Sequence, residues 1–206
     1  DERSKYQSAL ICYAIAKLEE VTTKKLEEAG SLSLFSNIEM PLVPVLAQMQ
    51  FNGMMVDESE LKDFGDTLKA QVETLSHEIC DLAGEEFNVN SHQQLGKILF
   101  EKLQLPVYKK TKNGYTTDVE VLEKLKGQHP IIEKILEYRT LAKLNSTYVE
   151  GLIPYINPKT KRIHSSFHQI ITATGRISST EPNLQNIPTR AELGKQIRKA
   201  FKPAEG

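Results

Sequence analysis

The stretch DESELKDFGDTLKAQVETLSHEICDLAG, residues 57–84, has the pattern of one long amphipathic helix. Asp57 is a favourable N-cap, and Glu60 three residues later makes an Asp variant of the capping box. Apolar residues then recur every three or four positions until Gly84 ends the segment. They are Leu61, Phe64, Leu68, Val72, Leu75, Ile79 and Leu82. At 1.5 Å per residue this helix is predicted to be about 39 Å long.

A second long helix is predicted from about Pro130. Its apolar stripe consists of Ile131, Ile135, Tyr138, Leu141, Leu144, Tyr148 and Leu152. Two long amphipathic helices separated by shorter elements are expected to pair antiparallel, because each can hide its stripe on the other.

Shorter elements surround this pair. A helix over about residues 3–29 should end at Gly30, and another should start after Asn37 as its N-cap. Ser91 with Gln94 forms a second capping box, which opens a short helix. The remaining expected elements are an extended piece in 51–57, a short helix in 118–127, a strand in RIHSSFHQIIT (162–172) and a short helix in 192–202. The predicted fold class is therefore mainly α with a small β component.

The charge is unevenly distributed, although the net charge is only −1. Residues 1–106 carry 9 Lys and Arg against 18 Asp and Glu, whereas residues 107–206 carry 17 against 9. Such asymmetry suggests an anionic partner such as nucleic acid for the basic half. The alternative is that the acidic and basic faces are solvated or face each other.

Three simple features of the sequence indicate the setting in which the protein is expected to work. They are its cysteines, its hydropathy and its ends. Cys12 and Cys80 offer neither a disulfide framework nor a metal-ligand spacing, so a reduced, intracellular protein is expected. No apolar run is long enough to span a membrane, and no membrane partner is expected. The chain lacks an initiator Met and begins in a helical pattern, which suggests a fragment of a longer protein.

The segment TATGRISSTEPNLQNIP, residues 172–188, combines polar side chains with helix breakers. It contains Arg176, Asn183, Gln185 and Asn186 together with Gly175, Pro182 and Pro188. The prolines remove amide donors and favour extended neighbours, so the segment cannot be a long helix. Amide side chains are also costly to bury without partners. The composition suits a surface whose polar groups meet a ligand.

This segment (the signature loop, residues 172–188), followed by GKQIRKAF, resembles the signature of the family A DNA polymerases. FSNIEMPLVPVL, FNVNSHQQLGKILFEKLQLP, EYRTLAKLNSTYVEGL and INPKTKRIHSSFHQ resemble the same family in order, so the resemblance covers nearly the whole chain. It implies that the long antiparallel helices form the thumb and that the strand and signature loop begin the palm. It also implies three parts: the end of a vestigial 3′–5′ exonuclease-like domain (1–30), the first polymerase helix with the thumb (31–156), and the start of the palm (157–206).

The resemblance implies template-directed DNA synthesis in replication and repair by the parent protein, a DNA-directed DNA polymerase in the bacterial cytoplasm and nucleoid. The implied partners are a primer–template duplex, an incoming dNTP, and the remaining palm and fingers. The parent would use Mg²⁺. The other class of function is a non-catalytic duplex DNA-binding module.

The signature loop has side chains that suit the minor groove of a DNA duplex. Minor-groove acceptors are present in all Watson–Crick pairs, so an arginine and amides could sense pair geometry without reading sequence. By resemblance, Arg176 should contact the primer-terminal pair, and Asn183 and Gln185 the adjacent duplex. The expected minor-groove set is Arg176, Asn183, Gln185, Asn186 and Arg190. The alternative for Arg176 is an ordinary surface salt bridge.

The second helix carries a polar row beside its apolar stripe. Arg139, Lys143 and Ser146 fall at i, i+4 and i+7, on one face. Cationic and hydroxyl groups of this kind suit backbone phosphates, and the resemblance assigns Arg139 and Lys143 to them. The expected backbone set is Arg139, Lys143, Ser146 and Thr147. The alternative is solubilising pairs with Glu137 and Glu150.

Two departures from the family concern metal binding. The exonuclease element Tyr-x-x-x-Asp corresponds to residues 6–10, where Leu10 replaces the carboxylate and cannot ligate a metal. The sequence also has no aspartate after Asp118, although phosphoryl transfer by polymerases needs metal-binding carboxylates. Residues 1–206 are thus expected to bind no metal and to be inactive alone. His164 and His168 are interpreted as structural.

Overall fold

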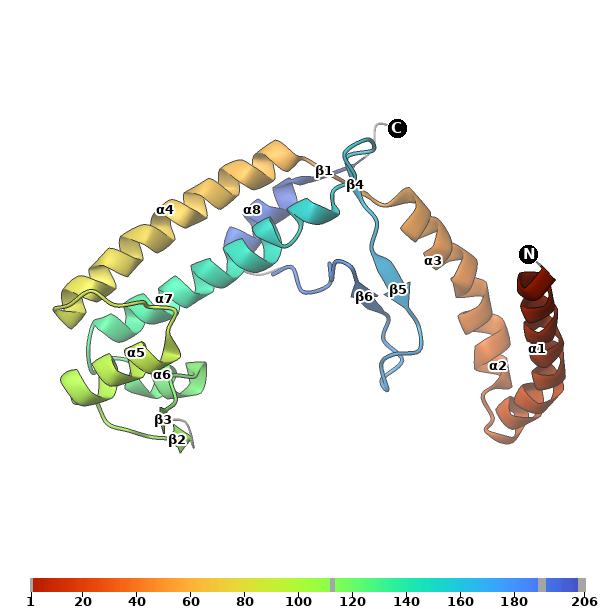
Figure 1. Cartoon of the computed structure of the whole chain (residues 1–206), viewed down its shortest axis with the longest axis horizontal. Coiled ribbons are helices and arrows are strands. Elements are labelled where there is room, and N and C mark those ends of the chain that lie inside the picture. Colours follow the sequence, from red (N-terminus) through yellow and green to blue (C-terminus); the bar gives the residue numbers. More distant parts are fainter. Residues whose placement is uncertain (1, 112–113, 189–191, 204–206) are drawn as a thin grey trace. The chain divides into compact units, whose positions relative to one another are not determined.

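The computed structural model of the chain describes residues 2–111, 114–188 and 192–203 (Figure 1). It is mostly helical with short antiparallel strands, which confirms the predicted fold class. The chain divides into two compact units. The first comprises Asp1–Gly53 and His164–Asn183, and the second comprises Met54–Ile163 and Leu184–Gly206.

Helices dominate the first unit. They are α1 (Glu2–Glu28), α2 (Leu32–Leu34), the π-helical turn η1 (Phe35–Glu39) and α3 (Met40–Asn52). The predicted end of the first helix is confirmed, because the chain leaves it at Gly30 with φ +65°. The predicted N-cap at Asn37 is wrong: helical structure already begins at Leu32, and the Asn37 amide donates to Ser33 Oγ (3.1 Å). Nothing between the two positions breaks the backbone ladder, so the helix runs through Asn37.

No single helix among the described residues is long and apolar enough to cross a membrane. Tyr6–Glu28 and Leu32–Asn52 pass that test only as a pair, with a 117° bend between them.

A hairpin of β5 (Ser166–His168) and β6 (Ser178–Thr180) completes the first unit, with Phe167 opposite Ser179. Gln50 of α3 holds it, since its side-chain oxygen accepts from Phe167 N (2.7 Å) and its carbonyl oxygen lies 2.9 Å from His164 Nδ1. The single strand expected over 162–172 is therefore wrong in extent. Its first part is β4 (Arg162–Ile163), which belongs to a different sheet, and His164 bonds to α3 instead of extending a strand.

The second unit is built on the two predicted long helices. α4 (Glu58–Ala83) and α7 (Ile131–Leu144), which continues as the π-helical η3 (Asn145–Glu150), run antiparallel side by side (Figure 1). Most of the predicted stripe residues are buried between them and their neighbours, and Gly84 ends α4 in the left-handed conformation. The predicted antiparallel pair is confirmed.

Gly65 of α4 brings the two helices into close approach. A Cβ at this position would lie 2.6 Å from Val149 Cγ1 of η3 and 3.4 Å from Asn145 Oδ1. A carbon–carbon contact normally needs about 3.5–4.0 Å, so only glycine fits at this separation.

The N-cap of α4 is confirmed, but its capping box is incomplete. Asp57 Oδ1 accepts from the backbone N–H groups of Ser59 (3.1 Å) and Glu60 (3.2 Å). Glu60 does not return the bond, because Asp57 N donates to Ala200 O (2.7 Å) and Glu60 pairs with Lys202 (2.6 Å). The tertiary partners on the C-terminal segment displace the local reciprocal bond.

A smaller group of elements lies between α4 and α7 in the chain. It comprises α5 (His92–Lys97), η2 (Ile98–Lys102), β2 (Lys110–Thr111), β3 (Gly114–Tyr115) and α6 (Val119–Leu125). Ser91 caps α5 by accepting from Gln94 N (3.3 Å), as predicted. The Gln94 side chain again does not return the bond, and instead accepts from Asn88 N (2.8 Å).

A three-stranded antiparallel sheet of order β4–β1–β7 closes the second unit. β1 (Met54–Val56) is its central strand, β7 is Phe201–Lys202, and α8 (Glu192–Lys199) packs on α4. The helix η4 (Ile153–Tyr155) precedes β4. Buried Ile163, Ile197 and Ala200 join this end to the helical core.

Candidate nucleic-acid interface

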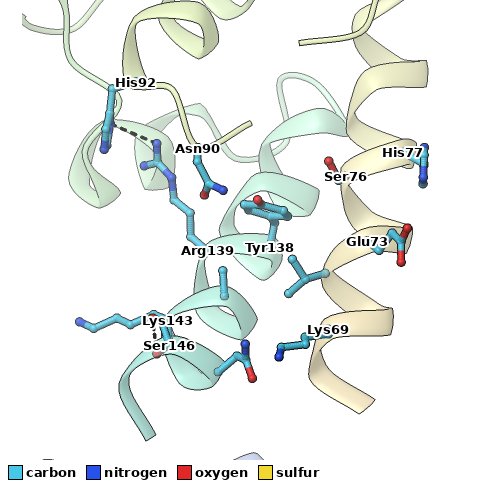
Figure 2. Close-up of a pocket in the computed structure, with 13 residues that line it drawn as sticks. Lys69, Glu73, Ser76, His77, Asn90, His92, Tyr138, Arg139, Lys143 and Ser146 are labelled. Carbon is cyan, nitrogen blue, oxygen red and sulfur yellow. Dashed lines mark hydrogen bonds between the residues drawn. The ribbon is translucent and has the colours of Figure 1, made fainter. Parts of the chain in front are cut away.

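A cavity of about 710 Å³ opens between α4, α7 and the segment that leads into α5 (Figure 2). Its polar lining includes Lys69, Glu73, Ser76, His77, Asn90, His92, Arg139, Lys143, Asn145 and Ser146. Three of the four predicted backbone-phosphate residues, Arg139, Lys143 and Ser146, therefore line one cavity. The fourth, Thr147, is exposed on η3 but does not line it.

Arg139 is half-buried and already has partners. Its Nη1 donates to the carbonyl oxygen of Thr117, and its Nη2 donates to Thr117 Oγ1 (2.9 Å). His92 Nδ1 lies 3.4 Å from the same Nη2. Burial lowers the pKa of the guanidinium, and the Asp118 carboxylate opposes that shift. Arginine nevertheless remains charged at any physiological pH.

Lys143 and Ser146 are more open. Both side chains are exposed, and Ser146 Oγ donates only to the carbonyl oxygen of Lys143 (3.3 Å), one turn earlier. Figure 2 shows the Lys143 side chain extending away from Arg139, whose guanidinium points toward His92. Within the described ranges, Lys143 forms no ion pair, so the predicted alternative of a pair with Glu150 is not what the geometry shows.

Glu150 instead joins the two long helices. Its carboxylate lies 3.1 Å from Lys69 Nζ of α4 and accepts from Asn145 Nδ2 (3.2 Å). The hydrogen bond from Lys69, with its charge, lowers the pKa of Glu150, and the Asn145 bond adds to the effect. Lys69 is thus partly neutralised, which leaves Lys143 as the more available cation on this wall of the cavity.

The signature loop is shared between the two units. In the first unit, Arg176 and Asn183 are exposed. The turn before Arg176 is closed by Thr172 Oγ1, which donates to Arg176 O, and by Gly175 at φ +72°. Asn183 Oδ1 accepts from Ser179 Oγ (3.2 Å), so this amide is oriented by β6.

In the second unit, two amide residues of the signature loop lie between two apolar residues and are turned outward. Leu184 and Ile187 pack against the core, whereas Gln185 and Asn186 are exposed. Tyr148 of η3 donates its hydroxyl proton to Asn186 O, which ties this loop to the long helix. Gln185 also lines a hollow of about 410 Å³ together with Arg198. Arg190 lies outside the described residues.

The described residues contain no cluster of three or more His, Cys, Asp or Glu side chains that could hold a metal ion. Leu10 is exposed on α1, and His164 and His168 each bond to a neighbouring group, the Gln50 carbonyl and the Thr180 hydroxyl.

Sequence reasoning did not single out Lys69, Asn90 and His92, which line the cavity, or the buried Thr117, which bonds to Arg139. Lys69 is one of several exposed lysines, and Thr117 lies 22 residues from its partner Arg139. No local pattern joins such positions, because they meet only where α4, the start of α5 and the segment before α6 pack around α7.

The helix pair, the small sheet and the signature loop define a nucleic-acid polymerase fold, and the chain belongs to DNA polymerase family A, whose model matches residues 58–206. DNA polymerase I of Geobacillus stearothermophilus is 50% identical over 192 residues, which are 93% of this chain and 22% of that protein. DNA polymerase I of Bacillus subtilis is also 50% identical over 192 residues, with the same shares. The chain thus spans about a fifth of the length of these curated relatives.

A solved structure gives the same result in three dimensions. The chain matches the POL domain of Pol1 from M. smegmatis, in complex with DNA primer-template and dNTP, with a TM-score of 0.84 and 40% identity. The match covers 94% of this chain and 34% of that one. The resemblance inferred from the sequence is confirmed.

Proposed function

We propose that the second unit grips a primer–template duplex, and that the protein containing this chain performs template-directed DNA synthesis in replication and repair. The observation that carries the proposal is the exposed cation Lys143 beside the Ser146 hydroxyl, on the open wall of the cavity between α4 and α7. The M. smegmatis structure, which contains a DNA primer-template, supports duplex DNA as the ligand.

A backbone grip suits this chemistry. Phosphates are present at every nucleotide, so cationic and hydroxyl groups can hold any sequence equally. Lys143 supplies an exposed charge, Ser146 and Thr147 supply hydroxyls, and Arg139 supplies a guanidinium whose direction is set by Thr117. We assign these four residues to the DNA backbone.

The signature loop is proposed to sense the minor groove. Arg176 would contact the primer-terminal pair, and Asn183, Gln185, Asn186 and Arg190 would lie along the adjacent duplex. The four described members of this set are exposed, which supports contact with a ligand. A mispair moves the minor-groove acceptors and leaves donors unpaired, so discrimination would follow from the lost hydrogen bonds.

Family membership implies a divalent metal for the parent activity, and we propose Mg²⁺ together with an incoming dNTP. No described residue is assigned to the metal, since the carboxylates do not cluster. We further propose that residues 1–30 end an exonuclease-like domain, that 31–156 contain the thumb, and that 157–206 begin a palm completed with fingers elsewhere. The proposed location is the bacterial cytoplasm, in association with the nucleoid.

The grip is tested with Lys143→Ala in the full-length protein. Fluorescence anisotropy with two duplexes of unrelated sequence, over a range of salt concentrations, should show equal weakening for both. The slope of log K against log salt should fall by about 0.9 for one lost phosphate contact. Lys134→Ala is the matched control, because this lysine lies on the same helix but pairs with Glu78 (2.7 Å). Equal slopes for both variants and the wild type would refute the grip.

A further inference from the structure

Three elements of the second unit meet in one hydrogen-bonded network beside the cavity, and Figure 2 shows its contact between His92 and Arg139. His92 begins α5, Thr117 precedes α6, and Arg139 lies in the middle of α7. Thr117 Oγ1 is 2.9 Å from both His92 Nδ1 and Arg139 Nη2, and Thr117 O accepts from Arg139 Nη1. Thr117 thus presents two oxygens to the two arms of one guanidinium.

The protons in this network can be assigned from the donors. A guanidinium only donates, so Thr117 Oγ1 accepts from Arg139 and has its own proton free to give to His92 Nδ1. Nδ1 is then an acceptor, and the ring carries its proton on Nε2. The Nη2 group of Arg139, 3.4 Å from Nδ1, faces the same lone pair. This assignment gives a donor and an acceptor to each contact in the network.

The network restricts where the guanidinium can be. Thr117 is 1% exposed, and a β-branched side chain in a packed site has few rotamers available. Three of the five guanidinium N–H groups point at Thr117 and His92, which leaves two on a side chain that lines the cavity. A long flexible side chain held in advance loses less freedom when a ligand binds.

We infer that Thr117 and His92 are positioning residues, which hold the Arg139 guanidinium at the cavity so that its remaining N–H groups meet a backbone phosphate of duplex DNA. The inference rests on the proposed function, since it assumes that Arg139 contacts DNA. Thr117 and His92 themselves lie outside the polar row of Arg139, Lys143 and Ser146.

The experiment compares variants of the full-length protein in the anisotropy assay, with melting temperatures to verify folding. Thr117→Val keeps the side-chain shape but removes the hydroxyl, and should weaken duplex binding by about three- to tenfold, the value of one hydrogen bond. Its salt slope should fall toward that of Arg139→Ala, by up to about 0.9. Thr117→Ser, which restores the hydroxyl, should restore both affinity and slope.

Substitution of His92 tests the same positioning role without disturbing the core, because the His92 side chain is exposed. His92→Ala should reduce affinity and slope in the same direction as Thr117→Val. His92→Asn can place an amide oxygen near the position of Nδ1, and should recover most of the loss. In the Arg139→Ala background, neither Thr117→Val nor His92→Ala should weaken binding further.

A failure of the positioning role and a failure of the DNA contact of Arg139 give different results. If Arg139→Ala weakens binding while Thr117→Val and His92→Ala leave affinity and slope unchanged, the positioning role is wrong and the grip stands. If Thr117→Val lowers only the melting temperature, Thr117 is structural and the inference is overturned. If Arg139→Ala itself changes nothing, the proposed DNA contact of Arg139 fails, and the inference fails with it.

Discussion

Replacing Gly65 by Ala should destabilise the second unit, although the same change usually stabilises a helix. Alanine has about 1 kcal/mol better helix propensity than glycine. At Gly65, however, the added methyl group would lie 2.6 Å from Val149 Cγ1, which is about 1 Å too close. Overpacking of this kind costs about 1–3 kcal/mol, so the net loss is expected to be up to about 2 kcal/mol.

Val149 is the neighbour that must move, and a double-mutant cycle isolates it. Val149→Ala alone removes two buried methyl groups and should cost about 2–3 kcal/mol. The Val149 Cβ lies 3.6 Å from the modified position, an ordinary contact distance, so the Gly65→Ala methyl should fit in that background. The loss of unfolding free energy in the double variant should then be smaller than the sum of the two single losses by about 1–3 kcal/mol.

The measurement is urea unfolding followed by far-ultraviolet circular dichroism. Ala70→Gly is the control, because Ala70 is on the exposed face of α4 and should report propensity alone, about 1 kcal/mol. A Gly65→Ala variant that is stabilised by this amount would refute the close approach of the helices. Additive single changes would show that Val149 is not the limiting contact.

Two further predictions concern the signature loop and the N-cap of α4. Arg176→Ala in the full-length protein should lower the single-turnover rate of nucleotide addition by about ten- to more than a hundredfold, the value of one charged hydrogen bond, with little change in duplex affinity. Gln185→Ala should chiefly alter extension past a buried mismatch; an intact single-turnover rate for Arg176→Ala would exclude the sensing role. Hydrogen bonds from the Ser59 hydroxyl and the Glu60 amide lower the pKa of Asp57 below 3.8, so its stabilisation is present above that pH and is lost as the pH falls through the lowered value. Asp57→Ala should lower the melting temperature by a few degrees at neutral pH, whereas Asp57→Asn, also a good N-cap, should not; a wild-type acid dependence retained in Asp57→Asn would contradict the assignment.

The sequence alone determined what depends on local chemistry. The stripe on α4, its cap at Asp57 and its stop at Gly84 were predictable, because helical period, N-caps and left-handed glycine act within a few residues. The stripe of α7 was predictable for the same reason. The signature loop also identified the family, since its residue order is read without any knowledge of contacts.

Only the tertiary structure decided which partner each polar side chain has. The side chains of Glu60 and Gln94 do not complete their capping boxes. Glu60 instead pairs with Lys202, and Gln94 accepts from the backbone N–H of Asn88. Arg139 and Lys143 are equivalent on a helical wheel, yet Arg139 is held by Thr117 and Lys143 is open to solvent. That difference arises where α5 and the α6 segment dock on α7, and burial and hydrogen bonding across 22 residues leave no mark in the local sequence pattern.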